Sequence, residues 1–103
     1  MSERIAQFRA LVAQDPANPL FRFSLGQTLF QVGDFREATE HLQAAADAKS
    51  DWMMPRIMLG KARLALQQKD QARAILSEAL KLAITQGHED PEAEIKAILA
   101  SLT

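Results

Sequence analysis

Side chains that could carry out chemistry are few in this sequence and lie far apart. The stretch HED, from His88 to Asp90, contains residue types that bind metals and transfer protons. Asp90 directly precedes Pro91, however, and an acidic N-cap followed by proline at the first helical position explains this pair without a site. His41 has no histidine four residues away with which to form a metal-binding pair on a helix. We therefore predict no metal site and expect His41 to be a solvent-exposed side chain.

The composition and motifs of the sequence also give no support to catalysis by cysteine or serine or to phosphate binding. The chain has no cysteine, which excludes disulfides, thiol nucleophiles and thiolate metal sites. Its serines have no recognisable base or oxyanion loop in the sequence, and no glycine-rich phosphate-binding motif is present. We therefore expect that the protein is not an enzyme and has no catalytic, cofactor-binding or metal-binding residues.

The balance of charges gives no broad attraction to a polyanion. Lys and Arg number 12 against 13 Asp and Glu, and the pI is near 6.1. Basic residues such as Lys61, Arg63 and Lys69 alternate with acids, so nucleic-acid binding is not expected. The N-terminal stretch is too often interrupted by charges for a signal peptide, and no apolar run approaches the roughly 20 residues of a membrane span. We expect a cytoplasmic protein without a membrane partner.

Apolar residues recur at helical spacing along the whole chain, and no alternating strand pattern competes with them. Ser2 is the expected N-cap of the first helix, Gly87 is the expected C-cap of the fifth, and Asp90 is the expected N-cap of the sixth. The spacing predicts an all-α single domain whose six helices cover approximately residues 3–14, 19–32, 38–46, 54–66, 72–86 and 91–102.

An internal repeat explains why glycines stand inside two of these helices. Leu25-Gly26 recurs as Leu59-Gly60 at an offset of 34 residues, and the same offset relates three further pairs: Ala38 and Ala72, Leu42 and Leu76, Ala45 and Ala79. Glycine in a helix interior costs about 1 kcal/mol relative to alanine, so a repeated glycine indicates a repeated packing requirement. We predict that each glycine lies close to an alanine of the next helix, Ala38 or Ala72.

These residues resemble the tetratricopeptide repeat family, whose 34-residue helix-turn-helix unit places Leu-Gly on helix A, Gly-Asp at the turn and alanines on helix B. The resemblance implies a short right-handed superhelix of stacked antiparallel pairs. It divides the chain into a half-repeat helix (1–18), two repeats (19–52 and 53–86) and a capping helix (87–103). The second repeat departs from the pattern because Gln67 replaces the turn glycine and Arg63 replaces an aromatic residue. Both repeats carry arginine, Arg22 and Arg56, where the family often has tryptophan.

In this family the A helices line a concave face that binds other proteins, so the resemblance implies a groove for a peptide or helix of a partner protein. The candidate groove residues are Leu20, Phe23, Gln27, Phe30, Gln31, Trp52, Met54, Ile57, Lys61 and Leu64. Lys61 is expected to meet an acidic group of the partner. Gln27 stands where some members have an asparagine that holds a partner's C-terminal carboxylate, so a clamp for such tails is not expected.

Other interpretations of these groove residues stay open. The apolar ones could be core residues covered by the sixth helix, since a chain with two full repeats needs much of its apolar surface for stability. Trp52 lies at the junction of the repeats and could either pack between them or stand at the rim of the groove as an anchor. The same surface could also mate with a second copy to form a homodimer.

Overall fold

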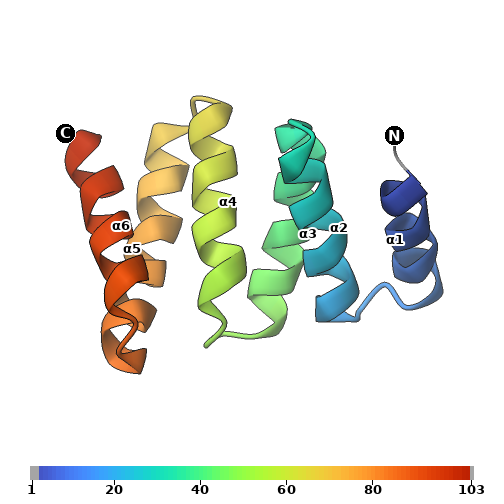
Figure 1. Cartoon of the computed structure of the whole chain (residues 1–103), viewed down its shortest axis with the longest axis horizontal. Coiled ribbons are helices and arrows are strands. Elements are labelled where there is room, and N and C mark those ends of the chain that lie inside the picture. The colour runs from blue at the N-terminus through green and yellow to red at the C-terminus, as the bar shows by residue number, and fades with distance from the viewer. Residues whose placement is uncertain (1–2, 103) are drawn as a thin grey trace.

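The computed structural model describes residues 3–102, which form six α-helices joined by short turns (Figure 1). The helices are α1 (Glu3–Gln14), α2 (Pro19–Gln31), α3 (Phe35–Ala48), α4 (Met53–Ala65), α5 (Lys69–Gln86) and α6 (Glu89–Ser101). No strand occurs in the described range, and the predicted all-α fold is confirmed. The predicted N-cap Ser2 lies outside the described residues.

Local side-chain chemistry accounts for several of the helix ends. Asn18 Oδ1 accepts hydrogen bonds from the backbone N–H groups of Leu20 and Phe21, at 2.9 and 3.1 Å, and so caps α2. Asp34 Oδ1 accepts from the backbone N–H three residues later, at 3.3 Å, and caps α3. Gly87 adopts the left-handed conformation, with φ of 74°, and ends α5 as predicted.

The start of α6 corrects the sequence prediction. The helix begins at Glu89, and His88 occupies the N-cap position without a side-chain hydrogen bond. Asp90 therefore lies inside the first turn and is not the N-cap. Its carboxylate interacts there with the positive end of the helix dipole. Pro91 is tolerated at the third helical position because the first N–H groups of a helix have no partner within it.

The two turns between helices A and B share one backbone conformation although their residues differ. Gly33 has φ of 87° and Gln67, its equivalent in the second repeat, has φ of 62°. Gln67 is the one non-glycine residue with positive φ in the described range. This conformation costs an L-residue about 1–2 kcal/mol. The packing of the repeat thus imposes the turn even where the sequence has lost the glycine.

The helices stack in sequence order along the long axis of a molecule that measures 38 × 27 × 20 Å (Figure 1). The tightest packing joins α2 to α3 and α4 to α5, and the α3–α4 contact joins the two repeats. The largest fully buried side chains between these layers are Leu25, Leu29, Leu42, Pro55, Leu59, Leu76 and Ile95. Along residues 3–102, no helix has the length and apolar character needed to cross a membrane.

The glycines inside α2 and α4 each make room for a leucine of the next helix. A Cβ atom on Gly26 would lie 2.8 Å from Leu42 Cγ, and one on Gly60 would lie 2.4 Å from Leu76 Cδ2. Helix A can therefore approach helix B closely only without a side chain at these positions. The predicted close approach is present, but the nearest atoms belong to leucines, not to the alanines one turn earlier, Ala38 and Ala72.

Candidate functional site

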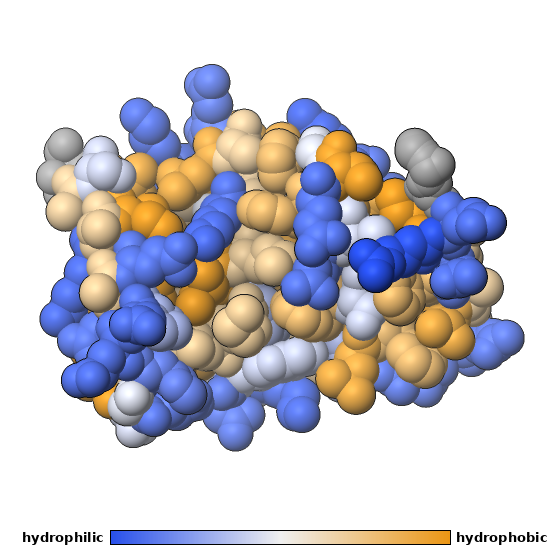
Figure 2. All heavy atoms as spheres, viewed as in Figure 1, coloured by the Kyte–Doolittle hydropathy of each residue, from blue (hydrophilic) through white to orange (hydrophobic). Residues whose placement is uncertain are grey.

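The front of the molecule in Figure 1 is formed by α2, α4 and α6, and we call it the A-helix face. Figure 2 shows the same side, where apolar side chains gather over α2 and α4 and hydrophilic side chains stand between them. Two large apolar residues on this face are strongly exposed, Leu20 at 59% and Met54 at 45%. The helices that the repeat pattern assigned to the groove therefore leave apolar surface open to solvent.

A cavity of about 190 Å³ lies on the A-helix face where α2, α4 and the first turns of α6 meet. Its lining residues are Phe30, Met54, Ile57, Met58, Lys61, Pro91 and Glu94. Pockets for small-molecule ligands usually measure about 300–1,000 Å³, so this cavity suits one or two apolar side chains better than a cofactor. We call it the Met58 cavity.

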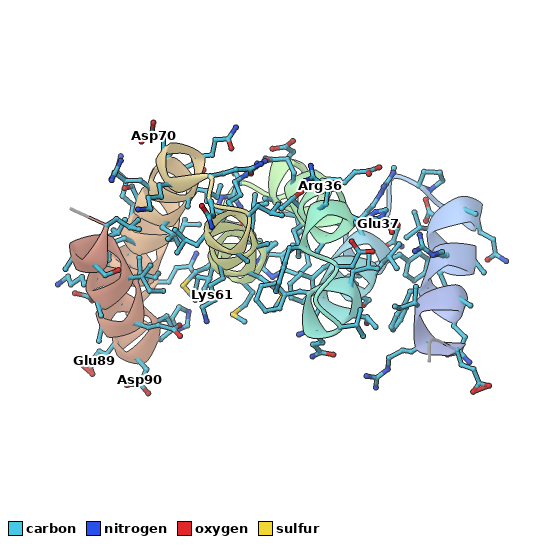
Figure 3. The ribbon with its side chains drawn as sticks, turned by 90° about the horizontal axis from the view of Figure 1, so that it is seen from above. Arg36, Glu37, Lys61, Asp70, Glu89 and Asp90 are labelled. Atoms are coloured by element: carbon cyan, nitrogen blue, oxygen red, sulfur yellow. The ribbon has the colours of Figure 1, made fainter. Side chains whose placement is uncertain are left out.

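Lys61 and Glu94 close one side of the Met58 cavity with an ion pair. Lys61 Nζ donates to Glu94 Oε2 at 2.9 Å, and the two side chains are 37% and 50% exposed. In Figure 3, Lys61 lies on the lower side of α4, facing the end of α6 that carries Glu89 and Asp90. The lysine that was expected to meet a partner's acidic group is thus already paired within the chain.

The predicted groove residues divide by burial. Leu20, Gln31 and Met54 are exposed, and Ile57 is buried at 6% exposure. The half-buried ones are Phe23, Gln27, Phe30, Trp52, Lys61 and Leu64. Four of the ten line the Met58 cavity: Phe30, Met54, Ile57 and Lys61.

Three residues of the cavity were missing from the predicted groove. Met58 lies one helical turn after Met54, so its spacing could have placed it on the same face. Pro91 and Glu94 belong to α6, and no pattern in the sequence indicates how that helix docks against α4. The sixth helix therefore forms one wall of the candidate site and leaves Met54 open to solvent.

Trp52 contacts the A-helix face from the junction between the repeats. Its ring lies 5.0 Å from the ring of Phe23, centroid to centroid, at an interplanar angle of 51°. Lys49 Nζ stands 5.4 Å from the centroid of the same ring, within cation–π range. Trp52 is half-buried, so part of this side chain stays exposed while its ring packs against Phe23 of α2.

The expectation that His41 is exposed to solvent is wrong. Its side chain is buried, with 7% exposure. Arg22 Nη1 lies 3.0 Å from His41 Nδ1, and His41 Nε2 lies 3.4 Å from Glu37 Oε2. Because guanidinium only donates, Nδ1 must accept, and the imidazole proton is left on Nε2 facing the carboxylate. Arg22 covers the imidazole from α2, a contact that no local pattern predicts.

Glu37 also ties α1 to this cluster. Nη1 and Nη2 of Arg9 both donate to its carboxylate, Nη2 to Oε1 at 2.9 Å. The hydrogen-bonded Arg9 guanidinium holds the pKa of Glu37 below its ordinary value, and the hydrogen bond from His41 acts in the same direction. Helix α1 is thus joined to α3 by an ion pair, and it also packs against α2.

Both arginines at the family's tryptophan position donate to backbone carbonyls near the junction with the preceding helix. Arg22 Nε donates to the carbonyl of Pro16 at 2.8 Å. Arg56 donates to the carbonyls of Ala46, Lys49 and Trp52, at 2.8–3.0 Å. These bonds fix the chain where one helix passes into the next, and the Lys49 carbonyl also accepts from the Trp52 backbone N–H at 3.2 Å. The two arginines therefore join successive helix pairs.

Among residues 3–102, no cluster of side chains is suited to hold a metal ion.

Comparison with known proteins agrees with this geometry. The profile of the tetratricopeptide repeat family matches residues 5–51 and 23–94. The TPR repeat-containing protein PA0015 of Pseudomonas aeruginosa is 33% identical over 92 residues, which cover 89% of this chain and 88% of that protein.

Two solved structures share the fold. The solution structure of protein BPP2914 from Bordetella parapertussis superimposes with a TM-score of 0.81 at 28% identity, over 99% of this chain and 89% of that one. The first TPR of Spaghetti (RPAP3), bound to the HSP90 peptide SRMEEVD, has a TM-score of 0.75 at 21% identity, over 93% and 77% of the two chains. With the repeated glycines, the left-handed turns and these matches taken together, the chain belongs to the tetratricopeptide repeat family.

Proposed function

We propose that this protein is an interaction module that binds a peptide or helix of another protein on its A-helix face. The observation that carries the proposal is the Met58 cavity, which is apolar on most of its walls and open to solvent. Met54, which lines the cavity, is 45% exposed, and Leu20 of α2 is 59% exposed, so both offer further apolar surface to a partner. Burying a large apolar side chain contributes about 1.5–3 kcal/mol, so a segment with two or three such residues would gain appreciable affinity here.

The family supports a binding role and gives no support to catalysis. Tetratricopeptide repeats are a scaffold type, and the RPAP3 repeat was solved with a peptide bound. Here the candidate anchors come from α2, α4 and α6, as in a site built between helices to hold an extended or helical segment. We place the partner's largest apolar side chain in the Met58 cavity.

Selection of a random peptide library against the purified protein tests the proposal. Met58→Glu puts a charge into the cavity and should reduce affinity for selected peptides by tenfold or more, because a desolvated charge opposes apolar burial. Glu40→Ala, on the exposed side of α3, is the matched control and should leave affinity unchanged. Circular dichroism establishes that both variants are folded.

A second measurement addresses the anchor on α2. Phe23→Ala removes the ring that packs on Trp52 and should cost about 2 kcal/mol or more of binding if Phe23 is an anchor. Loss of folding in this variant, or peptides that bind around Glu37 and Arg73 on the opposite side, would contradict the proposal. Light scattering of the free protein should show a monomer. A dimer that Met58→Glu dissociates would assign this face to self-association instead.

A further inference from the structure

We infer that the partner segment is basic as well as apolar, with lysine or arginine side chains flanking the residue that enters the Met58 cavity. This inference rests on the proposed function and specifies the chemistry of its partner. It differs from the sequence-based expectation of an acidic group opposite Lys61, because the ion pair with Glu94 occupies that lysine.

The first two turns of α6 set the charge beside the cavity. Four acidic residues lie there, and two of them are neutralised within the chain: Glu94 by Lys61 at 2.9 Å and Glu92 by Lys96 at 2.7 Å. The other two, Glu89 and Asp90, are exposed and form no ion pair in the described range. Figure 3 shows both at the lower end of α6, extending outward on the side of the molecule where Lys61 lies.

The other walls do not offset these two negative charges. The α2 and α4 residues that line the cavity are apolar apart from Lys61, and two uncharged polar residues of α2, the half-buried Gln27 and the exposed Gln31, were predicted for the same face. Glu89 and Asp90 immediately precede Pro91, which lines the cavity, so their backbone atoms lie within about one helical turn of it along α6. Exposed charges act over about 8–10 Å at ordinary ionic strength, which covers this distance.

Apolar and electrostatic features therefore coincide at one place. We expect a segment that inserts a large apolar side chain between α4 and α6 to bring its neighbouring residues near the start of α6, which carries Glu89 and Asp90. Lysine or arginine at those neighbouring positions is attracted, and aspartate or glutamate is repelled. An acidic segment would also have to displace Glu94 from Lys61 before it gained an ion pair.

The test compares peptides selected from a random library on the wild-type protein with their binding to charge variants, by calorimetry at low salt. Wild-type selection should enrich peptides that combine large apolar residues with a net positive charge. Glu89→Lys with Asp90→Lys should weaken a selected peptide about three- to tenfold, since each exposed pair contributes only about 0–1 kcal/mol. Glu3→Lys with Glu40→Lys makes the same change in net charge elsewhere and should alter affinity less than twofold.

The outcomes separate this inference from the proposed function. Peptides that depend on Met58 but are acidic or neutral would overturn the inference and leave the groove intact. The same holds if reversal of Glu89 and Asp90 does not weaken binding. If selected peptides bind Met58→Glu with the same affinity as the wild type, the proposed function itself is overturned. If the lysines loosen the start of α6, Glu89→Gln with Asp90→Asn removes the charges with less effect on the helix dipole and should still weaken binding two- to fivefold.

Discussion

Gly60→Ala tests the close approach of α4 and α5, because it adds a single methyl group at the point where the two helices meet. The added Cβ would lie 2.4 Å from Leu76 Cδ2 and 2.5 Å from Leu76 Cγ. Leu76 is fully buried, and one of the two atoms is its branch point, so the side chain cannot move aside without disturbing the core. Overpacking of this kind costs about 1–3 kcal/mol. We expect the upper part of that range.

A competing effect has the opposite sign. Alanine is favoured over glycine inside a helix by about 1 kcal/mol. We therefore expect Gly60→Ala to lower the free energy of unfolding by about 1–2 kcal/mol, measured by urea unfolding followed by circular dichroism. For a domain of this size, each kcal/mol corresponds to roughly 4–8 °C in melting temperature. Gly26→Ala, whose Cβ would lie 2.8 Å from its nearest leucine atom, should cost less.

A double-mutant cycle tests whether Leu76 is the cause. Leu76→Ala alone should cost about 2–5 kcal/mol, because it empties a fully buried site. In that background the Cβ added at Gly60 enters vacated space, so Gly60→Ala should cost nothing or stabilise the protein. If Gly60→Ala is as stable as the parent, or costs the same with and without Leu76, the assignment of the glycine to this close approach is wrong.

Three further predictions concern the turn, the joint between repeats and the docking of α1. Gln67→Gly should raise the free energy of unfolding by about 1 kcal/mol because it relieves a left-handed φ of 62°, whereas Gly33→Gln should lower it by a similar amount; urea midpoints that move the other way would contradict this. Arg56→Ala should cost about 2–4 kcal/mol because it removes three hydrogen bonds between a buried guanidinium and backbone carbonyls, and a cost below about 1 kcal/mol in the same assay would show that water replaces the arginine. The pKa of Glu37 is lowered by folding, so its contribution is present above its ordinary pKa near 4.5 and is lost as pH falls through the folded value. Arg9→Ala should therefore reduce the loss of unfolding free energy between about pH 7 and about pH 3. The reduction should be less than about 1 kcal/mol, since the pair is partly exposed.

The sequence by itself determined the number of helices, most of their ends and the period of the repeat. Helix formation depends on residues within one or two turns of each other, so apolar spacing and capping chemistry are sufficient to define it. The first helix occupies the predicted residues 3–14, and Gly87 ends the fifth. The 34-residue offset predicts that the second repeat has the same helices and turn as the first. Even Gln67 adopts the positive φ of the glycine that it replaces.

Contacts between helices were decided only by the tertiary structure. Which atom of α3 meets Gly26, whether His41 is covered and where α6 rests depend on the angle and register at which whole helices stack. Those quantities are set by the fit of many side chains at once, not by neighbours in sequence. Periodicity therefore placed Lys61 on the A helix of the second repeat, whereas only the docking of α6 brought Glu94 to within 2.9 Å of it and formed the cavity that both residues line.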